Sequence, residues 1–290
     1  MRWDDMRQSD NVEDRRGEGG RGGLPVGGLS IGGIVAVTVI SLLLGQNPLE
    51  MLGLLQPAQQ TPQQAAPHTA SNQPSGTLDK GKQLVSAVLG DTEDTWDRLF
   101  QQAGARYERP KLVLFRQAVS SACGRASSAV GPFYCPGDRK MYLDLGFFEE
   151  LQQRFAAPGD FAQAYVIAHE VGHHVQNLMG VSGQVHQKQQ GLGKKAANAL
   201  SVQLELQADC LAGVWGHYAH QRKLLDPGDM EEALTAAHAI GDDTLQRNAT
   251  GHVVPDAFTH GSSEQRMYWF KRGFETGDMR QCDTFSRGTS

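Results

Sequence analysis

Two histidines and a glutamate fall close together in the stretch YVIAHEVGHHVQ, residues 165–176. His169 and His173 are four residues apart, so on an α-helix they lie on one face, about one turn apart. Two imidazoles so placed can bind one metal ion, as two of the three protein ligands of a catalytic zinc. Glu170 would point beside the metal, where it could hold a metal-bound water and take its proton. The rival interpretation is a pair of core histidines satisfied by hydrogen bonds.

A third ligand has to come from another part of the chain. The pattern His-Glu-x-x-His-x-x-Gly-x-x-His fails, because Gln176 and Met179 stand where its glycine and third histidine would be. The later stretch ELQADC places Glu205 and Asp209 four residues apart on an apolar helix, where two carboxylates are costly without a cation or donors. We assign Glu205 to the metal and Asp209 to the outer N–H of a ligand histidine. The alternative is that both carboxylates are solvated.

Three other histidines are possible ligands, but their positions make them weaker candidates. His174 points away from the face that carries the first two histidines, and His217 and His220 lie beyond the carboxylate pair. A fourth protein ligand would leave no coordination position open for chemistry, so these residues also separate a catalytic site from a structural one.

The N-terminal part of the chain changes composition twice. Residues 1–23 are charged and glycine-rich, which predicts a disordered segment. Leu24–Gly45 carries no charge over 22 residues, enough to cross a bilayer core of about 30 Å at about 1.5 Å per residue. A buried core helix and a cleaved signal peptide are the alternatives. Residues 46–78 are rich in Gln, Pro and Ala and predict a flexible linker, and a globular domain follows over residues 79–290.

The distribution of basic residues predicts the orientation of this membrane helix. Arg15, Arg16 and Arg21 precede it, and the next Lys or Arg after it is Lys80. The positive-inside rule then places the N-terminus in the cytoplasm and the domain outside, in a periplasmic or extracytoplasmic position. Within the apolar segment the GxxxG spacing over residues 28–32 makes a homodimer possible, without further support.

Apolar spacing and turn signals predict an α+β domain that is mainly helical after a small sheet or hairpin. Residues 79–104 have helical spacing, KLVLFRQAV (111–119) reads as a strand, and residues 131–145 read as a hairpin around Pro136-Gly137-Asp138. Asp160 and Ser262 or Ser263 are expected helix caps. Further helices are expected at about 146–157, 160–179, 194–220, 228–247 and 262–275.

The four cysteines suggest two disulfides, because an exported domain meets an oxidising compartment. Three pairings are possible. We favour Cys123 with Cys135, which closes a short Gly/Ser-rich loop, and Cys210 with Cys282, which ties the tail to a helix. A four-cysteine zinc site is less favoured because no CxxC spacing occurs, and free buried cysteines are the remaining alternative.

Several strings resemble the bacterial membrane-anchored neutral zinc metallopeptidase family, over nearly the full length. They are HEVGHH, ELQAD, GPFYCPGDRKMYLDLGFF, FTHGSSEQRMYWFKRGFETGD and, most specific to that family, MRWDDMRQSDNVEDRRG. The metal-binding part is also similar to gluzincins of the membrane-peptidase type, whose third ligand is the Glu of Glu-x-x-x-Asp. The resemblance implies a zincin-like fold and zinc on His169, His173 and Glu205, with Glu170 as the base.

A further likeness is local. THGSSEQR resembles a late segment of those gluzincins in which an arginine follows a histidine by six residues, here His260 and Arg266. Those proteins have a proline after the histidine, whereas this chain has Gly261, which puts the backbone path in doubt. Either side chain could stabilise the oxyanion that develops when water attacks a peptide carbonyl. The alternative is that His260 starts a helix and Arg266 pairs with an acid.

Taken together, these features predict a membrane-tethered zinc endopeptidase that acts on a protein or peptide. The substrate could add as a strand to the edge of the 133–145 hairpin. A catalytically idle, zinc-stabilised scaffold and a hydrolase of a non-peptide amide are the alternatives. The formal charge of −5 shows no basic excess, so no nucleic-acid partner is expected.

Overall fold

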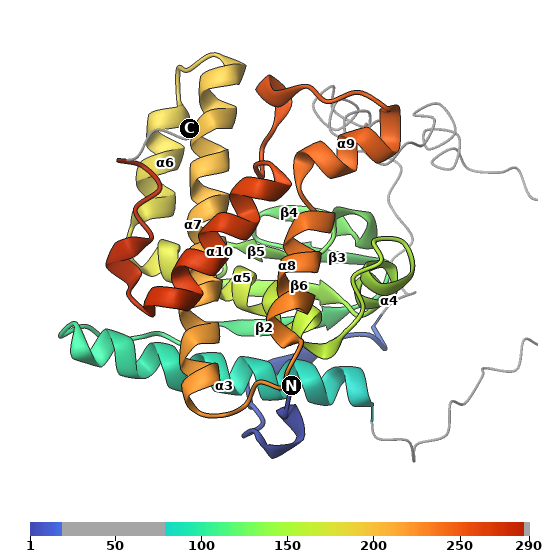
Figure 1. Ribbon diagram of the computed structural model, residues 1–290, viewed down its shortest axis with the longest axis vertical. Coiled ribbons are helices and arrows are strands. Elements are labelled where there is room, and N and C mark those ends of the chain that lie inside the picture. The colour runs from blue at the N-terminus through green and yellow to red at the C-terminus, as the bar shows by residue number, and fades with distance from the viewer. Residues whose placement is uncertain (19–78, 287–290) are drawn as a thin grey trace, which may run out of the picture.

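The computed structural model describes residues 1–18 and 79–286, and its main element is helix α5 (Asp160–Leu178). This helix contacts α3, α7 and α8 and the strands β5 and β6, so it lies between the sheet and a layer of helices (Figure 1). The other helices are α3 (Lys80–Gln102), α4 (Gly146–Gln153), α6 (Val181–Gln189), α7 (Lys194–Gln221), α8 (Asp229–Ala239), α9 (Asp242–Thr250) and α10 (Ser263–Thr276). The mainly helical α+β class is confirmed.

The sheet has four strands in the order β1-β2-β6-β5. Strands β1 (Val12–Asp14), β2 (Lys111–Phe115) and β6 (Lys140–Asp144) are parallel, and β5 (Phe133–Cys135) pairs antiparallel with β6, which confirms the predicted hairpin. The strand expected over 111–119 is two strands. Gln117, with φ of 64°, turns the chain after β2, and β3 (Ala118–Ser121) pairs with β4 (Gly124–Ser127) in a separate sheet.

Most helix predictions are confirmed to within a few residues, but the one expected over 228–247 is two helices. Gly241 caps α9 with extended backbone, and a Cβ there would lie 2.4 Å from the Ser263 hydroxyl oxygen, so α10 passes too close for a larger residue. Helix α6 was not predicted from the sequence. Ser262 caps α10 with a full capping box, whereas Asp160 is the first helical residue of α5 and Gly159 is its cap.

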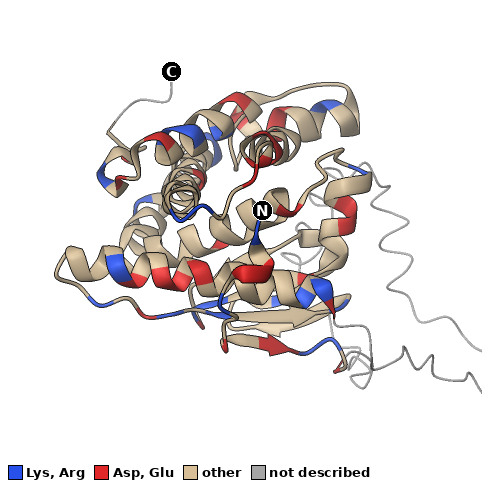
Figure 2. Cartoon of the chain, turned by 60° about the horizontal axis from the view of Figure 1, so that its bottom comes forward, with Lys and Arg blue, Asp and Glu red and all other residues tan. Residues whose placement is uncertain are grey.

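Residues 1–18 pack on the domain, so the prediction of a disordered N-terminus is wrong for them. The buried carboxylate of Glu93 on α3 accepts hydrogen bonds from Arg7 (2.9 Å), Ser9 (2.6 Å) and Asn11 (2.7 Å). Strand β1 then pairs with the edge of β2. Figure 2 shows the acidic residues along α3, close to the N-terminus. These partners are polar and distant in sequence, so apolar periodicity carries no sign of the contact.

This packing limits where the two parts of the chain can lie. Strand β1 pairs with β2 of the domain, whereas the predicted orientation would place the N-terminus and the domain on opposite sides of a membrane. The expected membrane helix over residues 24–45 and the linker over 46–78 fall outside the described residues. Among the residues that are described, no helix is both long and apolar enough to span a bilayer.

Both predicted disulfides are confirmed. Cys123, in the turn between β3 and β4, is bonded to Cys135 at the end of β5. Cys210 of α7 is bonded to Cys282, which follows the short helix Met279–Gln281. The first bond ties the small hairpin to the edge strand, and the second holds the C-terminal segment against α7.

Glu13 on β1 predicts an acid-sensitive contribution to stability. Burial raises the pKa of Glu13, but Lys140, Lys111 and Arg15 outweigh it and lower that pKa from 4.5 to about 2. A lowered pKa stabilises the fold fully above pH 4.5, and this stabilisation is lost as the pH falls toward 2. Glu13→Gln should therefore lower the free energy of unfolding at pH 6, with a difference from wild type that shrinks between pH 4.5 and pH 2. Urea unfolding at several pH values measures it, and a pH-independent difference would contradict the assignment.

Candidate metal centre

Helices α5 and α7 approach closely enough to share a metal site. A Cβ on Gly172 would lie 2.9 Å from the carbonyl oxygen of Ala208, so only glycine allows the two backbones to be so near. Gly172 lies between the two histidines of α5, and Ala208 lies between Glu205 and Asp209 of α7. The close contact therefore brings the two pairs of polar residues face to face.

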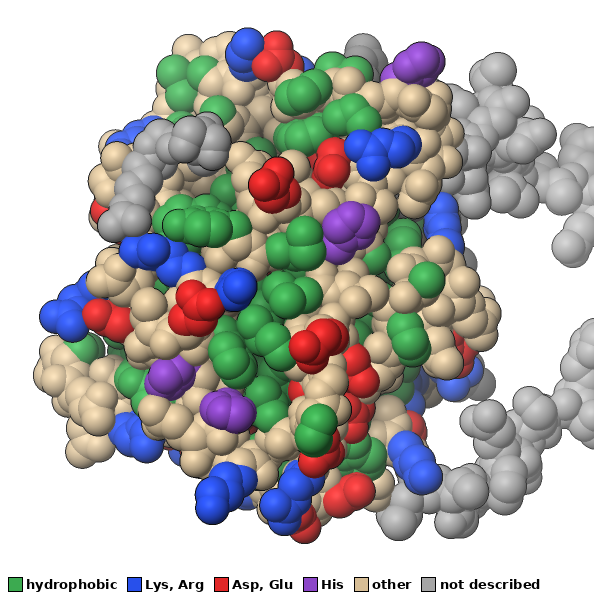
Figure 3. Space-filling view, viewed as in Figure 1, with side chains coloured by type: hydrophobic (Ala, Val, Ile, Leu, Met, Phe, Trp, Pro, Cys, Tyr) green, Lys and Arg blue, Asp and Glu red, His purple; other side chains and the backbone are tan. Residues whose placement is uncertain are grey.

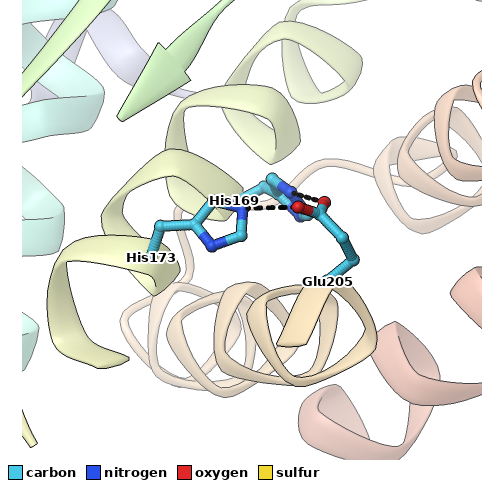
Figure 4. A group of neighbouring side chains, drawn as sticks. All are labelled: His169, His173 and Glu205. Atoms are coloured by element: carbon cyan, nitrogen blue, oxygen red, sulfur yellow. Dashed lines mark hydrogen bonds and ion pairs between the residues drawn. The ribbon is translucent and has the colours of Figure 1, made fainter. Parts of the chain in front are cut away.

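His169, His173 and Glu205 converge as the sequence predicts, with their ligand atoms all within 4.8 Å of one another (Figure 4). His169 Nε2 lies 3.2 Å from Glu205 Oε2, and His173 Nε2 lies 3.4 Å from Glu205 Oε1. The side chains are 8%, 15% and 18% exposed, so the site is shielded yet reachable. The alternative of a solvated Glu205 is excluded by this arrangement.

The donor set fits zinc. Two imidazole nitrogens and one carboxylate are a ligand set of catalytic zinc sites, and tetrahedral zinc with ligands at about 2.0–2.1 Å needs ligand atoms about 3.3 Å apart. The nitrogen–oxygen distances of 3.2 and 3.4 Å match that spacing. The three groups are the whole of this cluster within the described part of the chain, so a tetrahedral zinc held by them would keep a fourth position for solvent or substrate.

The charges around the site favour a cation. Burial raises the pKa of Glu205, but the histidines around it outweigh burial and hold that pKa well below its ordinary value. Burial lowers the pKa of His169, but the charge and hydrogen bond of Asp209 and the hydrogen bond of Glu205 raise it to about 10. A carboxylate that stays ionised while buried needs a positive partner, and a divalent metal supplies it with both imidazoles neutral.

Asp209 lies behind His169, as predicted. Its Oδ1 is 2.7 Å from His169 Nδ1 and accepts the hydroxyl of Tyr165 at 2.6 Å. An acceptor at Nδ1 leaves the Nε2 lone pair free to face Glu205 and the metal position. Asp209 is fully buried, so its orientation is set by these contacts.

Arg266 does not have the predicted role. Its Nε and Nη2 donate to the two oxygens of Asp209 at 2.9 and 3.0 Å, and Nη1 donates to the carbonyl of Ile240. The side chain is 3% exposed, and its Nη2 also lies 3.3 Å from the Tyr165 hydroxyl and 3.4 Å from His169 Nδ1. The guanidinium neutralises Asp209, so the expectation that it stabilises an oxyanion is corrected to the alternative of an arginine paired with an acid.

His260 is better placed for contact with a substrate. Partial burial lowers its pKa, but the charges of Glu205 and Asp242 outweigh burial and raise it. Its backbone N–H and Nδ1 face Asp242 at 2.7 and 3.3 Å, and the ring is half exposed. Within the described residues Nε2 has no hydrogen-bond partner. The half-exposed ring with this nitrogen unpaired keeps His260 a candidate for oxyanion stabilisation.

Glu170 is free to act as a base. Burial raises the pKa of Glu170, partly offset by His173 and His169, and the net pKa lies above its ordinary value. Its side chain borders a small gap of about 10 Å³ between α5 and strand β6. No hydrogen bond joins this carboxylate to another residue of the described chain. A carboxylate with a raised pKa, beside the ligands but not among them, suits the role of a general base.

The other histidines are engaged elsewhere. His174 is fully buried, with Nδ1 3.0 Å from the Tyr134 hydroxyl and Nε2 facing the carbonyl of Glu108, so it holds the edge strand β5 to α5. His217 has Nδ1 2.7 Å from the carbonyl of Phe274. Neither these two nor His220 belongs to the described cluster around Glu205.

Sequence reasoning missed three residues of this site. Tyr165 donates its hydroxyl to Asp209, the same carboxylate that faces His169. Asp242 faces Nδ1 of His260, and the amide oxygen of Gln176 faces Nδ1 of His173. Gln176 and Tyr165 carry a helical-spacing signal, since they lie three and four residues from a ligand histidine on α5. Asp242 carries none, because only the fold brings α9 to the loop before α10.

Comparison with known proteins agrees with this geometry. The model of the family described as "Putative neutral zinc metallopeptidase" matches residues 1–285. The chain belongs to this family. The family match supports a zinc-dependent hydrolase at a coarse level, and it extends over the N-terminal segment as well as the metal site.

Similar proteins occur in Escherichia coli and in Mycobacterium. The uncharacterized protein YpfJ of Escherichia coli (strain K12) is 46% identical over 290 residues, which is 99% of this chain and 99% of that protein. The uncharacterized protein Rv2575 of Mycobacterium tuberculosis (strain H37Rv) is 44% identical over 214 residues, 70% of this chain and 71% of its own. No solved structure matches the chain. The names of these relatives mention no substrate.

Proposed function

We propose that this protein is a zinc-dependent peptidase that hydrolyses peptide bonds. The observation that carries the proposal is the convergence of two imidazoles and a carboxylate from α5 and α7, with Glu170 free beside them. When bound, zinc would polarise the scissile carbonyl and make a water molecule more acidic. His169, His173 and Glu205 would hold the metal, and Asp209 would keep His169 aimed at it.

The remaining steps belong to residues of the chain. Glu170 takes a proton from the attacking water and delivers it to the leaving amine, which its raised pKa favours. His260 turns its unpaired Nε2 toward the developing negative charge on the carbonyl oxygen. The shielding of the ligand side chains limits water around the reacting atoms and strengthens both interactions.

An extended peptide is the substrate form that the architecture suits. Strand β5 pairs with β6 and forms one end of the four-stranded sheet, and it contacts α5 directly. Tyr134 on β5 is held by His174 and Asn177, one and four residues after His173. A substrate strand added to this edge would run beside the metal helix.

Glu170→Gln tests the reaction. It should lower kcat/KM for casein or a peptide by at least about 10²-fold, since general-base catalysis contributes about 10²–10⁴. Zinc content should stay that of the wild type, because Glu170 is not a ligand. Glu150→Gln, at an exposed position on α4, is the matched control and should leave both unchanged. Cleavage by Glu170→Gln at the wild-type rate would remove the proposal.

The alternatives have less support. An idle scaffold was expected to use a fourth protein ligand such as His217, which is bound to Phe274 instead. Hydrolysis of a non-peptide amide was expected to need a narrow pocket, and no observation favours it.

The surface shown in Figure 3 carries acidic, basic and apolar side chains that are interspersed with one another. The absence of a nucleic-acid partner and the possibility of a homodimer stay predictions.

The location is also a proposal. The two disulfides support an oxidising compartment for the domain, and the contacts of residues 1–18 with the domain support the same compartment for that segment. An anchor at residues 24–45 stays a prediction from composition, and a single membrane crossing there would instead separate residues 1–18 from the domain.

A further inference from the structure

Gln176 is fully buried, and its side-chain amide makes three polar contacts, all with residues of α5 and α7. Its Oε1 lies 2.9 Å from His173 Nδ1. Its Nε2 donates to the backbone carbonyl of Leu204 at 2.7 Å and to Gln207 Oε1 at 3.1 Å. The side chain therefore spans from the helix that carries the histidines to the helix that carries Glu205.

These contacts determine which nitrogen of His173 carries the hydrogen. The two hydrogens of the Gln176 amide both go to oxygen acceptors on α7, so only its oxygen remains to face the ring. That oxygen can only accept, so Nδ1 of His173 must donate. Nε2 is then left with its lone pair, and Nε2 is the atom that faces Glu205 at 3.4 Å.

The amide also sets the spacing of the ligands. Leu204 directly precedes Glu205, so the bond from Gln176 ties the His173 turn of α5 to the Glu205 turn of α7. Gln207 continues the chain of contacts, because its Nε2 donates to the carbonyl of Cys282 at 3.0 Å. Cys282 is bonded to Cys210, so the relay ends on a covalently held segment.

We propose that Gln176 is a positioning residue for the metal, fixing the tautomer and direction of His173 as Asp209 does for His169. The inference rests on the proposed zinc site. The two histidines differ in their partners: His169 faces a carboxylate neutralised by Arg266, and His173 faces a neutral amide. Gln176 thus orients its ligand without adding charge to the site.

Gln176→Met tests this role because methionine fills similar space but offers no strong acceptor. We expect zinc affinity, measured by competition with a chelator, to fall about 10–100-fold. Gln246→Met is the control. Gln246 is also a buried helical glutamine that accepts a backbone N–H, from Val254 at 2.7 Å, but it lies on α9 outside the cluster. Its zinc affinity should stay within about twofold of wild type, since no contact to a ligand is lost.

Gln176→Glu separates orientation from packing. A carboxylate still accepts from Nδ1, so zinc affinity should recover most of the loss seen with methionine, even if repulsion from the Leu204 carbonyl lowers the melting temperature. Equal zinc affinity for wild type and a folded Gln176→Met protein would overturn the inference, and so would equal losses for the Met and Glu variants.

The tautomer gives a readout that does not depend on the variants or on zinc. Long-range ¹H–¹⁵N spectra of the zinc-free wild type, at a pH where the ring is neutral, should show the His173 hydrogen on Nδ1. A hydrogen on Nε2 would overturn the inference. Failure of the wild type to bind zinc would instead remove the proposed function, so the two failures are distinguishable.

Discussion

Asp209→Ala is expected to lower the free energy of unfolding by about 3–5 kcal/mol, the usual cost of removing one partner of a buried ion pair. Asp209 is fully buried and Arg266 is 3% exposed, so the guanidinium would lose its counter-charge without gaining water. The Tyr165 hydroxyl, the carbonyl of Ile240 and, at 3.4 Å, Nδ1 of His169 would remain as its partners, and none of them carries a negative charge. Urea unfolding of the zinc-free protein measures the change.

The same substitution should weaken zinc binding about 10–100-fold, because His169 loses the acceptor for its Nδ1 hydrogen. The double variant Asp209→Leu with Arg266→Met separates the two effects. It removes both charges together, so stability should return to within about 2 kcal/mol of wild type. Zinc affinity should stay low, because the acceptor is still missing.

Two results would contradict this account. A double variant as unstable as Asp209→Ala would show that the loss does not come from the unpaired guanidinium. Wild-type zinc affinity in Asp209→Ala would show that His169 needs no partner at Nδ1.

A cysteine placed at residue 10 should be labelled from the same side of the membrane as one placed in the domain. The reason is energetic. Glu93 is buried, and Arg7, Ser9 and Asn11 are its hydrogen-bond donors from the N-terminal segment. Separating them would leave a buried carboxylate short of partners, which costs several kcal/mol, and would uncover the edge of β2.

Asp10→Cys and Lys188→Cys provide the measurement, because both positions are exposed. All four native cysteines are in disulfides, so each variant has a single free thiol. In intact cells a membrane-impermeant maleimide should label both variants to the same extent, before permeabilisation. Labelling of Lys188→Cys alone would show that the N-terminus lies across the membrane. Labelling of both only after permeabilisation would keep the shared side but exclude an exported domain.

Much of the site could be predicted because helix periodicity is a local property. Spacings of four residues place His169 with His173, and Glu205 with Asp209, on single faces whatever surrounds them. The capping box at Ser262 is local for the same reason. The disulfide pairing also followed from short-range and compartment arguments, and it was confirmed.

What the sequence left open depends on partners far apart along the chain. The contact between Gly172 and Ala208 brings Glu205 to the imidazoles, and Arg266 is paired with Asp209. The packing of residues 1–18 on Glu93 is another contact between residues far apart in the sequence. Periodicity indicates which side of a helix a polar residue occupies. A buried polar side chain then pairs with the complementary group that lies within reach. Which group is nearest follows from how the helices and strands pack, and no local pattern encodes it.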